Sequence, residues 1–137
     1  MTNDTGLRIN PRIKRLVCSK SGNEVDSGGF RRPIGLCSCC PPPGKPVIVD
    51  YDLSRVELGE PRRRAGMWSF ADLLPVVDPE PSFAADVGLT ATVELASWSR
   101  ALGVEVLAKN EGTNPSGSFK DRGLAAGIAF GAACGAR

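Results

Sequence analysis

The sequence contains no histidine, and this absence removes whole classes of catalytic site. Without an imidazole, the chain cannot build a Ser-His-Asp or Cys-His arrangement from its own residues, nor a metal centre with histidine ligands. Acid–base chemistry carried out by this chain must therefore depend on lysine, aspartate, glutamate, tyrosine or cysteine.

An excess of charge of one sign and long apolar runs are also missing. Lysine and arginine together number 17 and acidic residues 15, and this net charge of +2 does not point to nucleic acid or an anionic membrane. No apolar stretch approaches the roughly 20 residues of a membrane span, and the polar start MTNDTGLRINPRIK lacks the apolar centre of a signal peptide. We therefore expect a cytoplasmic protein with no nucleic-acid and no membrane partner, in which Arg62-Arg63-Arg64 is a solvated loop.

The cysteines, five in all, are an odd number in a chain without an export signal, which favours thiols or metal ligands over disulfides. Cys18, Cys37, Cys39 and Cys40 all fall within residues 14–53, and their thiolates would suit a structural zinc ion. The spacing departs from paired Cys-x-x-Cys knuckles, because Ser21 replaces a cysteine and the neighbours Cys39 and Cys40 would both have to be ligands. The prediction is a zinc-ribbon-like hairpin without metal, and a zinc site made of these cysteines stays open as the alternative.

Composition divides the chain into a series of segments. Residues 1–13 are polar and are predicted to be disordered. Residues 14–53 are predicted to form a small zinc-ribbon-like cysteine module, with strands in RLVCSKSG and PVIVDYDL and a loop in CSCCPPPGKP. Residues 54–88 form a predicted connecting segment, in which GMWSFADLLPV has apolar residues near helical spacing and ends at Pro75.

Residues 89–137 are predicted to be the start of an α/β domain. TATVELASWSRALG indicates a helix that ends near Gly103, VEVLAK a buried strand, NEGTNPSG a loop and SFKDRGLAAGIAFGAACGAR a second helix. These elements cannot make a sheet covered on both faces, so a further part of the protein or a second chain is needed to complete it. The last helix carries glycines at four-residue spacing on one face, where we expect a close neighbour, and a cysteine that we expect to be a small buried apolar residue: Gly123, Gly127, Gly131, Gly135 and Cys134.

A loop rich in turn residues, EGTNPSGSF, precedes Lys120. Gly112 and Gly117 match the beginning of a phosphate-binding loop, but Ser118 stands where that motif requires its lysine. The match fails at the residue that matters, so the phosphate loop is the less favoured alternative.

Ser118 and Asp121 form an S-x-x-D capping pattern, which would start a helix at Phe119 and place Lys120 in its first turn. Unpaired backbone N–H groups and the helix dipole disfavour a cation at that end. Lys120 is therefore either an exposed lysine that extends into water or a nucleophile wanted in its neutral form, as a Schiff base with an aldehyde cofactor requires.

The stretch KNEGTNPSGSFKDRG, residues 109–123, resembles the lysine-bearing segment of the threonine synthases. These enzymes belong to the fold type II (tryptophan synthase β-like) family that uses pyridoxal 5'-phosphate (PLP). MWSFADLLPV is similar to the segment before their first domain, and YDL at residues 51–53 resembles the end of their N-terminal cysteine module. The resemblance covers residues 17–137 and is strongest after Val104.

The resemblance implies an incomplete fold type II α/β domain preceded by a cysteine-bearing β-hairpin module. It implies that Lys120 binds PLP as a Schiff base and serves as the catalytic acid and base, with a small amino-acid substrate. The parent reaction converts O-phospho-L-homoserine and water to L-threonine and phosphate. In the family, a Ser-x-Gly-Asn loop and a glycine-rich phosphate cup would follow beyond Arg137, so the resemblance implies an inactive N-terminal fragment.

Two alternatives to this function stay open. The chain could belong to another fold type II enzyme, such as a threonine or serine dehydratase, because these enzymes use a similar lysine segment. It could also be a non-catalytic truncated product that acts as a small interaction module built on residues 14–53.

Overall fold

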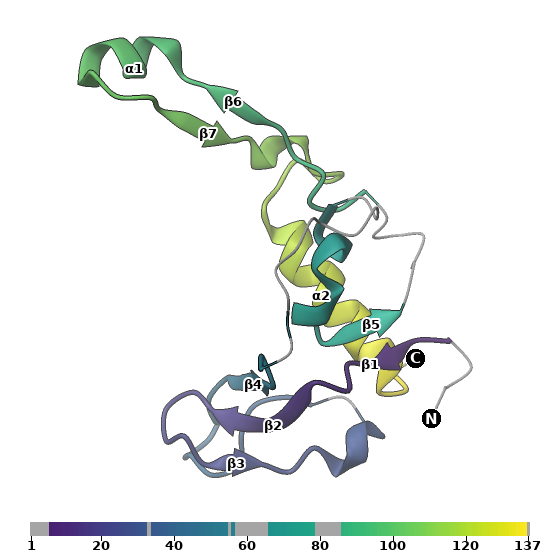
Figure 1. The fold of residues 1–137 in the computed structure, drawn as a ribbon. Coiled ribbons are helices and arrows are strands. Elements are labelled where there is room, and N and C mark those ends of the chain that lie inside the picture. The colour runs from purple at the N-terminus through teal and green to yellow at the C-terminus, as the bar shows by residue number, and fades with distance from the viewer. Residues whose placement is uncertain (1–5, 33, 55, 57–65, 79–85, 137) are drawn as a thin grey trace.

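The computed structural model describes residues 6–32, 34–54, 56, 66–78 and 86–136 (Figure 1). The protein is a mixed α/β structure with small antiparallel sheets. Its elements follow in the order β1 (Arg8–Ile9), β2 (Ile13–Cys18), β3 (Glu24–Val25), η1 (Gly28–Phe30), β4 (Val47–Tyr51), η2 (Gly66–Leu73), β5 (Val76–Asp78), β6 (Thr92–Glu94), α1 (Ala96–Leu102), β7 (Leu107–Lys109), η4 (Glu111–Thr113) and α2 (Lys120–Ala133). Arg62-Arg63-Arg64 lies outside the described residues.

The cysteine-bearing part of the chain is a sheet with the strand order β3-β2-β4. The strands predicted in RLVCSKSG and PVIVDYDL are confirmed as β2 and β4, which pair with Val17 opposite Ile48 and Cys18 opposite Val47. Leu16 on β2 is only 2% exposed. Because side chains alternate between the faces of a strand, Leu16 and Cys18 share the buried face.

The start of the described chain is more ordered than the sequence predicted for residues 1–13. Strand β1 pairs with β5, and Asn10 is 1% exposed. The side-chain amide of Asn10 donates to the carbonyl oxygens of Asp72 (3.0 Å) and Leu74 (2.8 Å). A polar start can be ordered in this way because one buried asparagine satisfies backbone groups of a distant segment.

The main apolar core lies between α2, η2 and the β1–β5 pair. Its buried members are Leu7, Met67, Trp68, Val76, Val87, Ala125 and Ala129. The cysteine module contacts the same helix through Phe30, whose ring meets Phe130 edge to face at 5.9 Å. Helix α2 therefore connects the core with the cysteine module (Figure 1).

The segment GMWSFADLLPV forms a 3-10 helix, η2, rather than a regular α-helix turn. It ends at Leu73, as the position of Pro75 predicted. The buried face carries Met67, Trp68 and Ala71, whereas Phe70 is 50% exposed. In the tighter 3-10 winding, the apolar residues of this segment do not all share one buried face.

The region after residue 89 differs from the prediction at its beginning. Residues expected to start a helix form β6, which pairs antiparallel with β7, and α1 occupies only the connection between these strands. Gly103 ends α1 in a left-handed conformation, as predicted. The strand expected in VEVLAK is confirmed as β7, but the expectation that it is buried is wrong, because Leu107 is 55% exposed. Figure 1 shows this β6–α1–β7 arm projecting away from α2.

The glycine face of α2 has no close neighbour over its first half in the part of the chain that the structure describes. A Cβ placed at Gly123 or Gly127 would meet no atom within 4 Å. Cys134 is buried as expected, at 1% exposure. Within the described residues, no helix has the length and apolar character needed to cross a membrane.

We predict that Gly66→Ala destabilises the chain by more than the cost of a left-handed backbone alone, which is about 1–2 kcal/mol for alanine. Gly66 has φ +67°, and a Cβ there would lie 2.1 Å from the carbonyl oxygen of Val87. Gly103→Ala is the matched control, because its φ is also +67° and its Cβ would meet no atom within 4 Å. Urea unfolding of both variants measures the difference, and equal losses would contradict the packing of Gly66 against Val87.

Candidate functional site

Lys120 lies at the first residue of α2, so its predicted place in the first helical turn is confirmed. The helix starts at Lys120 with Phe119 as the N-cap, one residue later than predicted. The Lys120 side chain is exposed, and its Nζ lies 4.5 Å from the centre of the Phe119 ring. The amine is therefore open to a small molecule that approaches from solvent.

The predicted capping box between Ser118 and Asp121 is wrong in its side-chain pairing. The Ser118 hydroxyl accepts from the backbone N–H of Lys120 at 3.2 Å, whereas the Asp121 carboxylate accepts from the N–H of Ser116 at 2.8 Å and from its hydroxyl. These bonds to Ser116 hold the pKa of Asp121 below its usual value. The turn before Lys120 is thus closed by Ser116 and Asp121.

A bidentate ion pair joins α2 to the loop that precedes it. Arg122 donates from Nε to Oε2 of Glu111 and from Nη2 to Oε1, both at 2.7 Å. The two side chains are 34% and 26% exposed. A forked guanidinium–carboxylate pair fixes both distance and orientation, so it positions the helix start relative to η4.

The same carboxylate is also bonded to Thr90 and Asn114. Thr90 donates its hydroxyl to Glu111 at 2.9 Å and accepts from Arg122 at 3.1 Å. Asn114, 4% exposed, donates to Glu111 at 3.0 Å and accepts from the N–H of Gly88 at 2.9 Å. We call Gly88, Thr90, Glu111, Asn114 and Arg122 the Glu111 network. It ties the residues before β6, the loop before α2 and the turn that bears Lys120 into one unit.

The Glu111 network sets the ionisation of its central groups. The hydrogen bond from Arg122 lowers the pKa of Glu111 to about 2, helped by Asn114 and Thr90 and opposed by partial burial. The same pair raises the pKa of Arg122 above its usual value. Both charges are therefore present at neutral pH.

Sequence reasoning identified Lys120 but gave no role to Glu111, Asn114 or Arg122. The sequence does show that Glu111, Asn114 and Arg122 flank the lysine in a segment rich in turn residues. This was the one feature that could have pointed to them. Which acid pairs with which base depends on how the loop turns back on α2. That return depends on the distant Gly88 and Thr90, and spacing along the chain does not show it.

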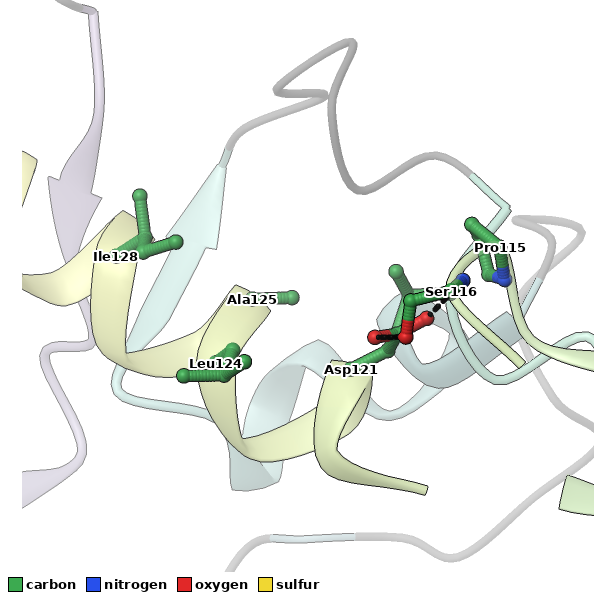
Figure 2. Close-up of a pocket in the computed structure, with 7 residues that line it drawn as sticks. Pro115, Ser116, Asp121, Leu124, Ala125 and Ile128 are labelled. Atoms are coloured by element: carbon green, nitrogen blue, oxygen red, sulfur yellow. Dashed lines mark hydrogen bonds between the residues drawn. The ribbon is translucent and has the colours of Figure 1, made fainter. Parts of the chain in front are cut away.

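A pocket of about 390 Å³ lies along α2, close to the turn that carries Lys120 (Figure 2). Its lining residues are Val87, Pro115, Ser116, Asp121, Leu124, Ala125 and Ile128. Figure 2 shows Ser116 and Asp121 hydrogen-bonded to each other at one end and the apolar side chains along the helix. Lys120 is not among the lining residues.

The thiols of the cysteine module also gather in one place. The sulfurs of Cys18, Cys37, Cys39 and Cys40 all lie within 4.8 Å of one another, and all of these residues are free thiols. Hydrogen bonds from Ser21 lower the pKa of Cys18 to about 5, whereas burial raises the pKa of Cys40 to about 12. This residue set is the candidate for holding a metal ion, and Lys120 is the candidate for holding an organic cofactor.

We predict that the Glu111 network makes the chain less stable in acid. A carboxylate whose folded pKa of about 2 lies below the ordinary value of 4.5 contributes its full stability above pH 4.5 and loses it as the pH falls to about 2. The free energy of unfolding should therefore fall over this interval, and the fall should be smaller in Glu111→Gln. Urea unfolding at a series of pH values measures it.

Glu105→Gln is the matched control for this experiment, because Glu105 is an exposed glutamate outside the Glu111 network. Its pH dependence should follow that of the unsubstituted chain. If Glu111→Gln and the unsubstituted chain lose stability in parallel, the depressed pKa of Glu111 is contradicted.

Comparison with known proteins finds threonine synthases. The chain is 35% identical to the threonine synthase of Methanocaldococcus jannaschii over 86 residues, which cover 60% of this chain and 21% of that protein. It is 42% identical to the threonine synthase of Bacillus sp. (strain ULM1) over 60 residues, covering 44% of this chain and 17% of that protein. The threonine synthase of Halalkalibacterium halodurans is 36% identical over 66 residues, covering 48% of this chain and 19% of that protein.

No protein-family profile and no solved structure matches the chain. The chain spans about a fifth of the length of the curated relatives it matches. These partial similarities support a threonine synthase-like family, whose members use PLP.

Proposed function

We propose that this chain is the lysine-bearing part of a threonine synthase-like, PLP-dependent enzyme of fold type II. The observation that carries the proposal is the placement of Lys120. Its exposed amine stands at the start of α2, in a turn that the bidentate Glu111–Arg122 pair fixes to η4. The similarity to curated threonine synthases supports the family.

Lys120 fits the role of the residue to which PLP is attached. The backbone around it does not offer a site for the phosphate group of PLP. The Lys120 amine is exposed, as covalent attachment of an aldehyde requires. The backbone N–H groups of Lys120, Asp121 and Arg122 already donate to Ser118 and Phe119, so they are not free to hold a phosphate. The phosphate would therefore be held by another part of the protein.

The reaction that we propose for the whole enzyme is the conversion of O-phospho-L-homoserine and water to L-threonine and phosphate. PLP, when bound, supplies an electron sink for the carbanion chemistry. Lys120 would hold the cofactor through its amine and, once released by the substrate amine, would move protons between substrate carbons. The Glu111 network positions this lysine. A chain without histidine can carry out such steps, because the lysine serves as both acid and base.

The exposed apolar surface of this chain supports the proposal that a further part of the enzyme or a second chain completes the α/β domain. Leu124 and Ile128 on α2 are 60% and 55% exposed beside the pocket, and Trp98 on α1 is 62% exposed. The open faces of Gly123 and Gly127 allow another backbone to approach α2 closely. We propose that the rest of an α/β domain covers these surfaces.

We predict that the 137-residue chain alone forms no L-threonine from O-phospho-L-homoserine. Because we propose that another part of the protein holds the phosphate, borohydride trapping of bound PLP should label Lys120 no more than the exposed Lys14. Peptide mass spectrometry measures the labelling, and a threonine assay measures turnover. Turnover by the chain alone would contradict the proposal that other parts of the site are required.

A chimera tests the role of Lys120 in the reaction. Residues 88–136 of this chain replace the corresponding segment of the Methanocaldococcus jannaschii threonine synthase, aligned on the lysine. The chimera should retain PLP after dialysis, be trapped at Lys120 and form threonine, and Lys120→Ala should lose all of these properties. A chimera that binds PLP at another lysine, or a Lys120→Ala chimera that keeps its activity, would overturn the assignment.

A further inference from the structure

We propose that Cys18, Cys37, Cys39 and Cys40 bind one zinc ion as a structural site, which departs from the metal-free hairpin expected from the sequence. Their sulfurs lie within 4.8 Å of one another. In a tetrahedral site with zinc–sulfur bonds of about 2.3 Å, the sulfurs are about 3.8 Å apart. The Cys18 and Cys40 sulfurs are already 3.7 Å apart, so only a small contraction of the other distances is needed.

The unusual spacing of these cysteines is explained by Ser21. In a Cys-x-x-Cys knuckle that starts at Cys18, the second cysteine would stand at position 21. The Ser21 hydroxyl lies 3.5 Å from the Cys39 sulfur, so Cys39 reaches the place that the missing cysteine would occupy. Cys39 and Cys40 are neighbours in the chain, yet both sulfurs reach the cluster.

Backbone donors around the cluster suit negatively charged sulfurs. The N–H of Ser21 points to the Cys18 sulfur at 3.5 Å, and the N–H of Lys45 points to the Cys37 sulfur at 3.3 Å. Such contacts orient metal ligands from outside the coordination sphere. The turn that ends at Gly44 places Lys45 there, and Gly44 itself has no room for a side chain, since its Cβ would lie 2.3 Å from the Cys37 carbonyl oxygen.

The cysteine module has little else to hold it together. Among the described residues of 14–53, the buried hydrophobic residues are Leu16, Cys18 and Cys37. A module with so small a core usually needs a disulfide or a metal. Cys18 closes the end of β2 and the other cysteines precede β4, so one ion would join both strands and contribute its binding energy to folding.

Zinc is the metal that this donor set fits best. A closed set of thiolates in tetrahedral geometry is typical of structural zinc, and it leaves no open position for catalysis. The proposed site is independent of the proposed reaction, because no group of the Glu111 network belongs to it. Failure of one proposal therefore leaves the other intact.

The test uses the whole chain, purified without chelator and analysed for zinc by mass spectrometry, then loaded with Co²⁺ as a spectroscopic probe. We expect one zinc per chain and the strong visible and near-ultraviolet bands of tetrahedral cobalt with thiolate ligands. Cys18→Ser and Cys39→Ser should weaken cobalt binding by about tenfold or more. Cys134→Ala is the matched control and should bind as the unsubstituted chain does, because Cys134 lies outside the cluster.

A rescue variant keeps the test decisive if single variants fold poorly. Adding Ser21→Cys to Cys39→Ser restores a Cys-x-x-Cys knuckle and should restore the cobalt spectrum. Absence of metal from the unsubstituted chain would overturn the zinc site. So would a metal content in Cys18→Ser and Cys39→Ser equal to that of the unsubstituted chain. A double variant that binds no better than Cys39→Ser would overturn the assignment of Cys39 as the substitute ligand.

Discussion

The bidentate pair between Arg122 and Glu111 is the interaction on which the lysine-bearing region depends. Helix α2 has few large side chains to bury and open glycines on one face, so apolar packing alone does not fix where it begins relative to the preceding loop. The two short hydrogen bonds of the pair set that position. Thr90 and Asn114 add the segment before β6, so hydrogen bonds join the three parts.

Lys120 gains its position from this network without belonging to it. Its side chain is exposed, and its backbone N–H is capped by Ser118. The amine that we propose for cofactor attachment can then stay accessible while its backbone is held in place, as a rigid support allows. The cysteine module lies at the other end of α2, joined through Phe30 and Phe130, and a zinc ion there would stabilise the fold without meeting the substrate.

Sequence patterns predicted those features that depend on neighbouring residues. Such local patterns predicted the strands around Cys18 and Val47. They also predicted the end of α1 at Gly103 and the place of Lys120 in a first helical turn. Sequence patterns missed the ordered structure near the N-terminus, strand β6 and the pairing of Asp121 with Ser116. The ordered N-terminus and β6 arise from contacts with other segments, such as Asn10 with Leu74, which periodicity does not contain. The Asp121–Ser116 pairing arises from the way the loop turns just before α2.

Amide hydrogen exchange at Gly88 is the most direct test of the central role of the Arg122–Glu111 pair. The N–H of Gly88 donates to Asn114, so it reports whether the Glu111 network is intact. In Arg122→Lys, which keeps the charge but loses the fork, we expect Gly88 to exchange faster, while the N–H of Cys18, bonded to Asn23 in the cysteine module, stays protected. Exchange at Gly88 that is unchanged in Arg122→Lys would contradict this account.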